Sequence, residues 1–165
     1  MVFDKTGTLT SGKPTVTDVV AFKGMNDHDI LLLAASLEQG SEHSLGEAIV
    51  AQSTSLGLSL STVTNFEAVA GRGITGIITK MPLALGNRAL MKQKRVSFGA
   101  SEEKIRALET EGKTVMLLSR GTKLLGIVAV ADTVKNSAQT MVTSLKNMGI
   151  RVWIITGDNE RTASA

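Results

Sequence analysis

An aspartate follows the apolar start of the sequence and opens a segment rich in turn-forming residues. Met1-Val2-Phe3 has the character of a strand end, and Asp4 is followed by Lys5-Thr6-Gly7-Thr8-Leu9-Thr10. A carboxylate directly after a strand lies where α/β folds bind their ligands, and it can act as a covalent nucleophile toward a phosphoryl group. Gly7 permits a tight turn whose amides and hydroxyls point at phosphate oxygens. The alternative is an ordinary surface turn.

A second candidate for phosphate chemistry lies near the other end of the chain. The apolar run Ile154-Ile155 leads into Thr156-Gly157-Asp158. Thr156 and Gly157 would place a hydroxyl and an amide beside a transferred phosphoryl group, which is the stabilisation that phosphoryl transfer chiefly needs. Taken alone, this tetrapeptide with Asn159 is a common turn.

The middle of the chain holds three segments suited to a nucleotide. In Ser41-Glu42-His43-Ser44-Leu45, His43 follows an acid and precedes a helix start, a position suited to packing against an adenine ring. An isolated histidine is more often a surface or core residue. Asn87 follows an apolar strand and is expected to cap a helix.

The glycines at 71 and 73 form the third segment. Gly71-Arg72-Gly73-Ile74-Thr75-Gly76 fits the dinucleotide pattern Gly-x-Gly-x-x-Gly, which must open a helix and be followed by an acid about 20 residues on. The residues after Gly73 are strand-like instead, and no acid occurs before Glu102. We therefore expect Gly71 and Gly73 to allow close approach of backbone to a nucleotide, or to form a bulge or tight turn.

Apolar periodicity predicts the elements that position these segments. Helices are expected at 27–39 with Asn26 as N-cap, 45–54, 88–94, 101–111, 134–148 and after Gly157. Strands are expected at 1–3, 16–22, 63–69, 74–79, 83–86, 114–119, 124–130 and, buried, 151–156; residues 4–14 are expected to be loop. Asp132 or Thr133 is a candidate N-cap for the 134–148 helix.

The fold class that follows is α+β, an antiparallel sheet flanked by helices inserted into an incomplete α/β domain. The ends of the chain alternate strand, loop and helix, as in a parallel α/β sheet. The expected boundaries are 1–14 and 129–165 for the two pieces of the α/β domain and 15–128 for the inserted domain.

Composition excludes several classes of function. The chain has 18 basic and 15 acidic residues, a net charge of +3 and 3% aromatic residues, so it offers no footprint for nucleic acid. It has no cysteine, which excludes disulfides and thiolate metal sites. No apolar stretch approaches the roughly 20 residues that span a bilayer. We expect a soluble, monomeric chain.

In their order along the chain, these motifs resemble those of heavy-metal P-type ATPases, pumps of the haloacid-dehalogenase superfamily. The run from Val2 to Thr10 resembles the phosphorylation signature, and Thr156-Gly157-Asp158 the second signature. Ser41-Glu42-His43 resembles the Ser-Glu-His-Pro-Leu motif, with Ser44 where the family has proline. Gly71, Gly73 and Asn87 also match family positions, and the resemblance covers essentially the whole chain.

The resemblance implies a role for each site residue. Asp4 would form the aspartyl-phosphate with Lys5 and Thr6 beside it, and Mg²⁺ would be held partly by the Asp4 carboxylate and the Thr6 carbonyl. ATP or ADP would bind at Glu42, His43, Gly71, Gly73 and Asn87. Phosphatases of the superfamily carry a second aspartate as general acid and base at the position of Thr6. Its absence favours a pump, because water would attack the aspartyl-phosphate slowly.

In the complete pump this chain would be a cytoplasmic part of an integral membrane protein, with the actuator and membrane helices as partners. The expected cargo is Cu⁺. A zinc- or cadmium-exporting relative, a soluble haloacid-dehalogenase-type phosphatase and a non-catalytic nucleotide sensor are the alternatives. We expect the isolated chain to bind nucleotide with little or no turnover, because a further Mg²⁺-binding motif of the family is not in this sequence.

Overall fold

The computed structural model describes residues 1–22, 24–41 and 43–155, with the backbone only at Lys5, Thr6 and Asn136. Its strands are β1 (Val2–Asp4), β2 (Thr10–Ala21), β3 (Thr64–Val69), β4 (Gly73–Ile78), β5 (Met81–Gly86), β6 (Thr114–Arg120), β7 (Lys123–Val134) and β8 (Trp153–Ile155). Its helices are α1 (Asp27–Glu38), α2 (Ser44–Ser55), α3 (Arg88–Gln93), α4 (Glu102–Thr110) and α5 (Asn136–Asn147). A π-helical turn covers Lys5–Leu9 and a 3₁₀ turn covers Gly99–Ser101.

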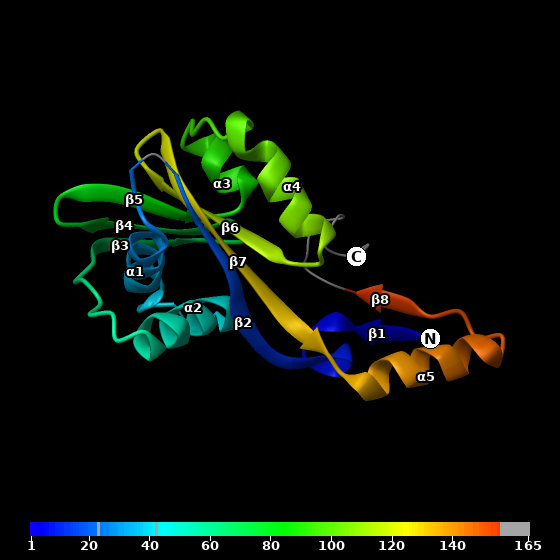
Figure 1. Ribbon diagram of the computed structural model, residues 1–165. Coiled ribbons are helices and arrows are strands. Elements are labelled where there is room, and N and C mark those ends of the chain that lie inside the picture. The colour runs from blue at the N-terminus through cyan, green and yellow to red at the C-terminus, as the bar shows by residue number, and fades with distance from the viewer. Residues whose placement is uncertain (23, 42, 156–165) are drawn as a thin grey trace.

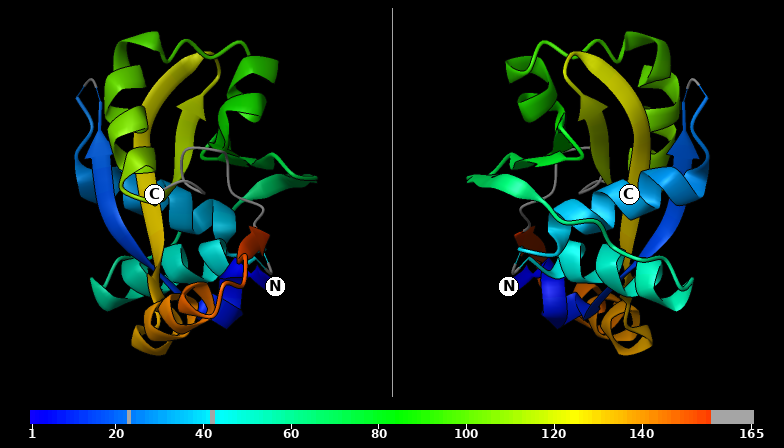
Figure 2. Two further views of the ribbon diagram at one scale, coloured as in Figure 1. Left: turned by 90° about the vertical axis from the view of Figure 1, so that its right-hand side faces the viewer. Right: turned by 90° about the vertical axis from the view of Figure 1, so that its left-hand side faces the viewer.

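Six strands form one antiparallel sheet in the order β2-β7-β6-β5-β4-β3 (Figure 1). Helices α1 and α2 cover one face, and α3 and α4 cover the other (Figure 2). In β6, Met116 and Leu118 belong to the core under α1, whereas Val115 and Leu117 belong to the core under α3 and α4. Burial on both faces explains why this strand is a continuous apolar run. The predicted antiparallel sheet flanked by helices is confirmed.

Helix α1 begins where its sequence predicts. Asn26 adopts an extended backbone and its side chain accepts a hydrogen bond from the Asp29 amide at 2.9 Å, while Asp29 accepts one from the Asn26 amide. This capping box satisfies two amides that the first turn would leave unpaired. The helix then buries Ile30, Leu31 and Ala34 against the sheet.

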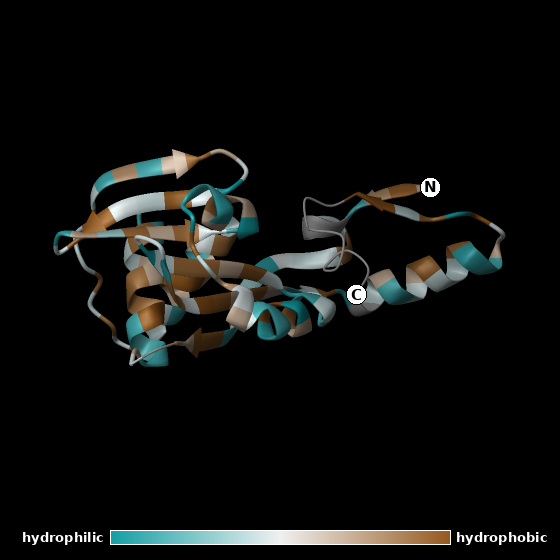
Figure 3. Ribbon diagram, turned by 90° about the horizontal axis from the view of Figure 1, so that it is seen from above, coloured by the Kyte–Doolittle hydropathy of each residue, from teal (hydrophilic) through white to brown (hydrophobic). Residues whose placement is uncertain are grey.

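A separate parallel pair, β1 with β8, lies beside α5 and away from the large sheet (Figure 1). The strand predicted over residues 151–156 is confirmed for Trp153–Ile155, but its predicted burial is wrong. Trp153 and Ile155 are 63% and 64% exposed, because no layer of described residues covers them. The apolar character of both strands is visible near the N-terminus in Figure 3.

The boundaries differ from expectation where the two longest strands meet. Residues 10–14 were predicted as loop, but β2 begins at Thr10, which pairs with Val134, and a bulge accommodates Pro14. β7 extends to Val134, so α5 begins at Asn136 rather than at Val134. The predicted capping role of Asp132 or Thr133 is wrong, because Lys135 occupies the N-cap position and Asp132 bonds to β2 instead.

None of the helices in the described ranges is long and apolar enough to cross a bilayer.

Candidate functional site

The first candidate segment forms a tight turn at the end of a strand. Asp4 is the last residue of β1 and is exposed, and the backbone then turns through Lys5–Leu9. Gly7 has φ +77°, a conformation that favours glycine, and its amide donates to Thr10 Oγ1 at 3.1 Å. The predicted turn at Gly7 is therefore confirmed.

Lys135 holds this turn from the far end of the chain. Its Nζ donates to the carbonyl oxygens of Gly7 at 2.9 Å and Thr8 at 3.2 Å. Its backbone amide donates to the Leu9 carbonyl at 2.9 Å. Lys135, which directly follows β7, thus donates hydrogen bonds to three successive carbonyls, and these bonds fix the backbone that follows Asp4.

Asp132 is a second link between the same segments. Its carboxylate accepts hydrogen bonds from Thr10 Oγ1 at 2.5 Å, Ser11 Oγ at 2.8 Å and the Gly12 amide at 3.1 Å. Burial alone would raise the pKa of Asp132, but these hydrogen bonds and one from the Lys13 amide outweigh it and lower the pKa. The ionised carboxylate of Asp132 therefore holds the start of β2 against the end of β7.

The structure describes the strand that leads to the predicted partners of Asp4, but it does not describe those partners themselves. Parallel pairing sets Asp4 opposite Ile155, so the chain leaves β8 at the same edge at which Asp4 ends β1. Thr156, Gly157 and Asp158 lie outside the described residues, as do the side chains of Lys5 and Thr6. Their predicted roles are not tested.

The exposed Asp4 carboxylate and the Thr6 backbone carbonyl are hard oxygen donors of the kind that Mg²⁺ prefers. The neighbouring carbonyls of Gly7 and Thr8 each accept a hydrogen bond from Lys135 Nζ. The donor set thus fits the predicted ion. Elsewhere, no cluster of three or more acidic or histidine side chains that could hold a metal occurs in the described part of the chain.

Gly71, Gly73 and Asn87 come together at the start of the β4–β5 hairpin. The Asn87 side-chain amide donates to the Gly71 carbonyl at 2.9 Å, and its backbone amide donates to the Arg72 carbonyl at 2.8 Å. Gly73 pairs with Gly86, and a Cβ on Gly73 would lie 2.2 Å from the Leu85 carbonyl oxygen. The close approach that the structure shows joins two protein backbones, and the predicted approach of a nucleotide to these glycines stays a prediction.

Asn87 also caps α3 as predicted. Its Oδ1 accepts hydrogen bonds from the amides of Ala89 at 3.0 Å and Leu90 at 3.2 Å. One side chain therefore holds the glycine turn with its amide and the helix start with its oxygen.

His43, another of the predicted site residues, caps helix α2. Its Nδ1 accepts a hydrogen bond from the Leu45 amide at 3.3 Å, and the residue is exposed. That bond orients the ring and leaves the opposite ring nitrogen without a role in the cap. Glu42 lies outside the described residues, so the predicted convergence of Glu42, His43 and Asn87 on one pocket stays a prediction.

Sequence inspection missed Glu38, the last residue of α1. It is only 4% exposed, and its Oε2 has no hydrogen-bond partner among the described residues. Burial raises the pKa of Glu38, opposed by the Ser41 hydroxyl and the nearby charge of His43. The available signal was helical spacing, because position 38 lies one turn after the buried Ala34, where a charged residue is unexpected.

Two hollows among the described residues lie elsewhere. One of about 380 Å³ is lined by Lys146 and residues 149–153, and the other, of about 200 Å³, lies between β2, α1 and α2 around Asp18 and His28. Neither includes Gly71, Asn87 or His43. The case for a nucleotide site therefore depends on the hydrogen-bonding groups and not on the shape of a cavity.

Comparison with known proteins gives one family description over the whole chain. The model of the haloacid dehalogenase-like hydrolases matches residues 1–165. The chain is 46% identical over 165 residues to a copper-exporting P-type ATPase of Bacillus subtilis and 41% identical to a probable copper-importing P-type ATPase of Enterococcus hirae. All of this chain is matched in both cases, but it spans only 21% and 22% of those relatives.

Solved structures agree with this. A zinc-transporting PIB-type ATPase in its E2.Pi state matches 99% of the chain with a TM-score of 0.75 and 36% identity, and 26% of that structure's chain is covered. The N-domain of HMA8, a copper-transporting P-type ATPase, matches 71% of this chain and 99% of its own at a TM-score of 0.61. Its identity of 22% supports the fold alone.

Proposed function

Because the chain belongs to the haloacid dehalogenase-like hydrolases and corresponds to a segment of heavy-metal P-type ATPases, we propose that it is the ATP-binding and phosphorylated part of a pump for Cu⁺. The curated relatives named as copper pumps are 41% to 47% identical, whereas the solved zinc-transporting structure is 36% and the N-domain of the copper-transporting HMA8 22% identical. The similarity to the curated copper pumps is the reason for proposing copper as cargo. In the complete pump the chain would face the cytoplasm, with the actuator and the membrane helices as partners.

The boundaries proposed from the sequence, 1–14, 15–128 and 129–165, fall within continuous strands. β2 crosses the first boundary and β7 the second, and these two strands pair with each other. The proposed nucleotide-binding domain is therefore joined to the Asp4 segment by a two-stranded connection rather than by flexible linkers.

One observation carries the nucleotide proposal: Asn87 fixes the turn at Gly71–Gly73 and the start of α3 simultaneously. This preorganises backbone that a ligand can approach closely. His43 and Glu42 would contact the adenine, and the unpartnered Oε2 of Glu38 would accept a hydrogen bond from its exocyclic amine. A buried acceptor without a partner is costly, and a ligand donor would remove that cost.

Phosphoryl transfer would then proceed to Asp4. A carboxylate oxygen of Asp4 would form a bond to the γ-phosphorus as the bond from that phosphorus to the bridging oxygen breaks, and ADP would leave. Asp4 and the Thr6 carbonyl would hold Mg²⁺, which supplies charge neutralisation on the phosphate oxygens. Lys135 and Asp132 would keep the loop after Asp4 in place. Thr156, Gly157 and Asp158 would stabilise the transferred group, with Lys5 nearby.

Titration of the chain with ATP, ADP and AMP, followed by backbone amide NMR, tests the placement of the site. We expect shifts at Glu42, His43, Gly71, Gly73 and Asn87 with all three ligands if the adenine provides most of the recognition. Shifts confined to the hollow at residues 146–153 would contradict it. In a pump that contains this segment, Asp4→Asn is expected to abolish phosphorylation while the nucleotide affinity of the isolated chain is unchanged.

A further inference from the structure

The start of β2 carries a bulge that brings the strand back against the turn after Asp4. In the ladder between β2 and β7, residues 11–13 of β2 lie between the paired positions 10 and 14, whereas a single residue of β7 lies between the partners of those positions. Extra residues in one strand bend that strand, and such bulges are common beside functional sites. Here the bend carries Gly12 onto the turn.

Gly12 lies against the backbone of Gly7. It has φ +70°, and a Cβ at position 12 would be 3.2 Å from the Gly7 Cα and 3.8 Å from the Gly7 nitrogen. The shorter distance is less than the roughly 3.5–4.0 Å at which carbon atoms pack best, so a side chain there would require Gly7 to move. The left-handed backbone and the close approach therefore both select glycine at position 12.

Hydrogen bonds on both sides of Gly7 resist such a movement. Its amide donates to Thr10 Oγ1 at 3.1 Å, and its carbonyl accepts from Lys135 Nζ at 2.9 Å. Thr10 Oγ1 donates in turn to Asp132, which also accepts from the Gly12 amide at 3.1 Å. The turn and the bulge thus form a closed ring of contacts, so a displacement of Gly7 would either break one of these bonds or shift the turn that follows β1.

We propose that Gly12 is a positioning residue for the phosphorylation of Asp4, because its missing side chain sets the place of Gly7 and thereby the course of the turn after the Asp4 carboxylate. This deepens the proposed function and rests on it. Phosphoryl transfer needs the attacking oxygen in line with the bond that breaks, so small misplacements slow the step strongly. Nucleotide binding depends on other elements and should not change.

Gly12→Ala in a pump that contains this segment is the test. We expect the single-turnover rate of Asp4 phosphorylation by ATP to fall about tenfold, with the ATP concentration for half-maximal rate unchanged. Gly57→Ala is the matched control, because Gly57 has φ +69° but a Cβ at position 57 meets no atom within 4 Å. Alanine suffers the same backbone strain at both positions, so we expect a similar loss of stability but wild-type phosphorylation in the control.

Amide exchange in the isolated chain tests whether Gly12 acts through Gly7. We expect faster exchange of the Gly7 amide in Gly12→Ala, because its bond to Thr10 Oγ1 is disturbed, and wild-type exchange in Gly57→Ala. If Gly12→Ala does not fold, Gly12→Asn replaces it, since asparagine tolerates left-handed backbone but still carries a Cβ. Failure of both to fold while Gly57→Ala folds would make Gly12 a requirement of folding and overturn the proposal.

The remaining outcomes separate this inference from the proposed function. Wild-type phosphorylation in Gly12→Ala overturns the inference alone, and so does slow phosphorylation with unchanged exchange at Gly7. Equal slowing in Gly57→Ala also overturns it, because backbone strain and not the contact would then be the cause. A wild-type pump that ATP does not phosphorylate on Asp4 overturns the proposed function and this inference together.

Discussion

At the scale of single residues, the candidate site contains a group whose burial is unfavourable. Glu38 has its pKa raised because burial penalises the charged carboxylate. In the folded state it therefore binds a proton more tightly than in the unfolded state, whose value is near 4.5. Folding stability must then fall as pH rises from 4.5 through the folded-state pKa.

Replacing Glu38 should therefore separate stability from binding. Glu38→Gln is expected to raise the free energy of unfolding at neutral pH by about 1 kcal/mol, because it removes a buried charge. The gain should shrink toward pH 4.5, and ATP affinity should fall. Urea unfolding at several pH values checks the first part and calorimetric titration the second. A variant less stable than wild type at pH 7 would contradict this.

The two bonds of Asn87 can also be separated. Asn87→Asp keeps the oxygen that caps α3 but has no donor for the Gly71 carbonyl, whereas Asn87→Ala loses both. We expect faster amide exchange at Gly71–Gly73 in both variants. Loss of about 1 kcal/mol of stability from the missing cap is expected in Asn87→Ala only. Unchanged exchange at the glycine turn in Asn87→Asp would show that the bond to Gly71 has no structural effect.

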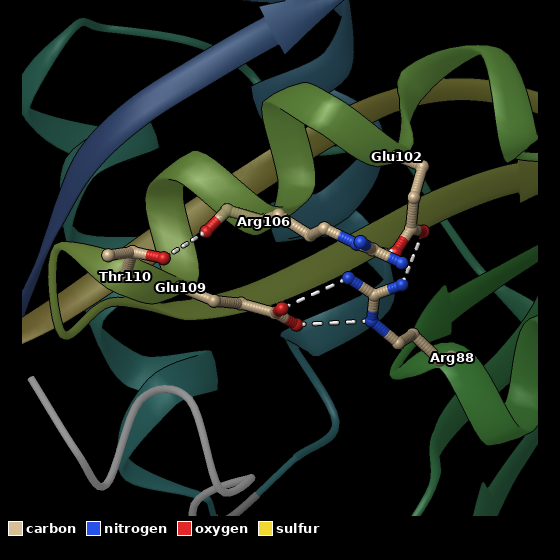
Figure 4. Close-up of polar contacts among 5 residues, drawn as sticks. All are labelled: Arg88, Glu102, Arg106, Glu109 and Thr110. Carbon is tan, nitrogen blue, oxygen red and sulfur yellow. Dashed lines mark hydrogen bonds and ion pairs between the residues drawn. The ribbon is translucent and has the colours of Figure 1, made fainter.

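At the scale of elements, α3 is tied to α4 by an ion-pair cluster (Figure 4). Arg88 donates to both carboxylate oxygens of Glu109, at 3.1 and 3.0 Å, and also pairs with Glu102. Glu102 pairs in addition with Arg106 one turn along α4. Because Arg88 directly follows Asn87, this cluster holds the helix start on which the glycine turn depends.

Members of this cluster should differ in importance according to burial. Glu109 is 3% exposed and Arg106 has a side chain that is 59% exposed. Glu109→Gln is expected to lower the free energy of unfolding by about 2 kcal/mol, because it leaves a half-buried guanidinium with an impaired partner. Arg106→Gln, the control, should change it by less than about 0.5 kcal/mol. Equal effects in thermal unfolding would refute the ranking.

At the scale of the whole molecule, β2 and β7 connect the six-stranded sheet to the β1–β8 pair (Figure 1). Asp132 and Lys135 hold these strands to the loop after Asp4. Because the pKa of Asp132 is lowered, its contribution to stability is present above its unfolded value of about 3.8 and is lost as pH falls through the folded-state pKa.

Asp132→Asn is expected to lower stability at neutral pH by about 1–2 kcal/mol, with the difference from wild type disappearing in acid. Ser11→Ala removes one exposed donor of the same cluster and should have a smaller effect. Amide exchange at residues 7–12 measures the loosening of the loop directly. If the Asp132→Asn protein showed wild-type amide exchange at residues 7–12, Asp132 would not be what holds the loop in place.

The purified chain is expected to bind ATP but to show little or no steady-state hydrolysis. Thr6 cannot act as the general base that activates water, so the reaction should stop after phosphorylation of Asp4. A coupled-enzyme assay with Mg²⁺ and ATP checks this. Robust hydrolysis that survives Asp4→Asn would argue for contamination, and robust hydrolysis lost in Asp4→Asn would contradict the expectation.

Local sequence determined most elements and several site positions. Features that depend on neighbouring residues can be predicted from the sequence. They include the capping box at Asn26, the helix cap at Asn87 and the turn at Gly7. The antiparallel sheet was predictable because apolar runs separated by glycine turns have few other solutions. The order of the motifs along the chain likewise indicates the family from the sequence alone.

Only the tertiary structure decided what depends on residues distant in sequence. Asp132 accepts a hydrogen bond from Thr10, which lies 122 positions away in the sequence, so no local pattern could distinguish this contact with β2 from a helix cap. The exposure of β8 depends on which layers cover it, and the burial of Glu38 depends on how closely α2 approaches at Gly46. Propensities and caps are properties of a segment, whereas burial and charge pairing belong to the packed chain.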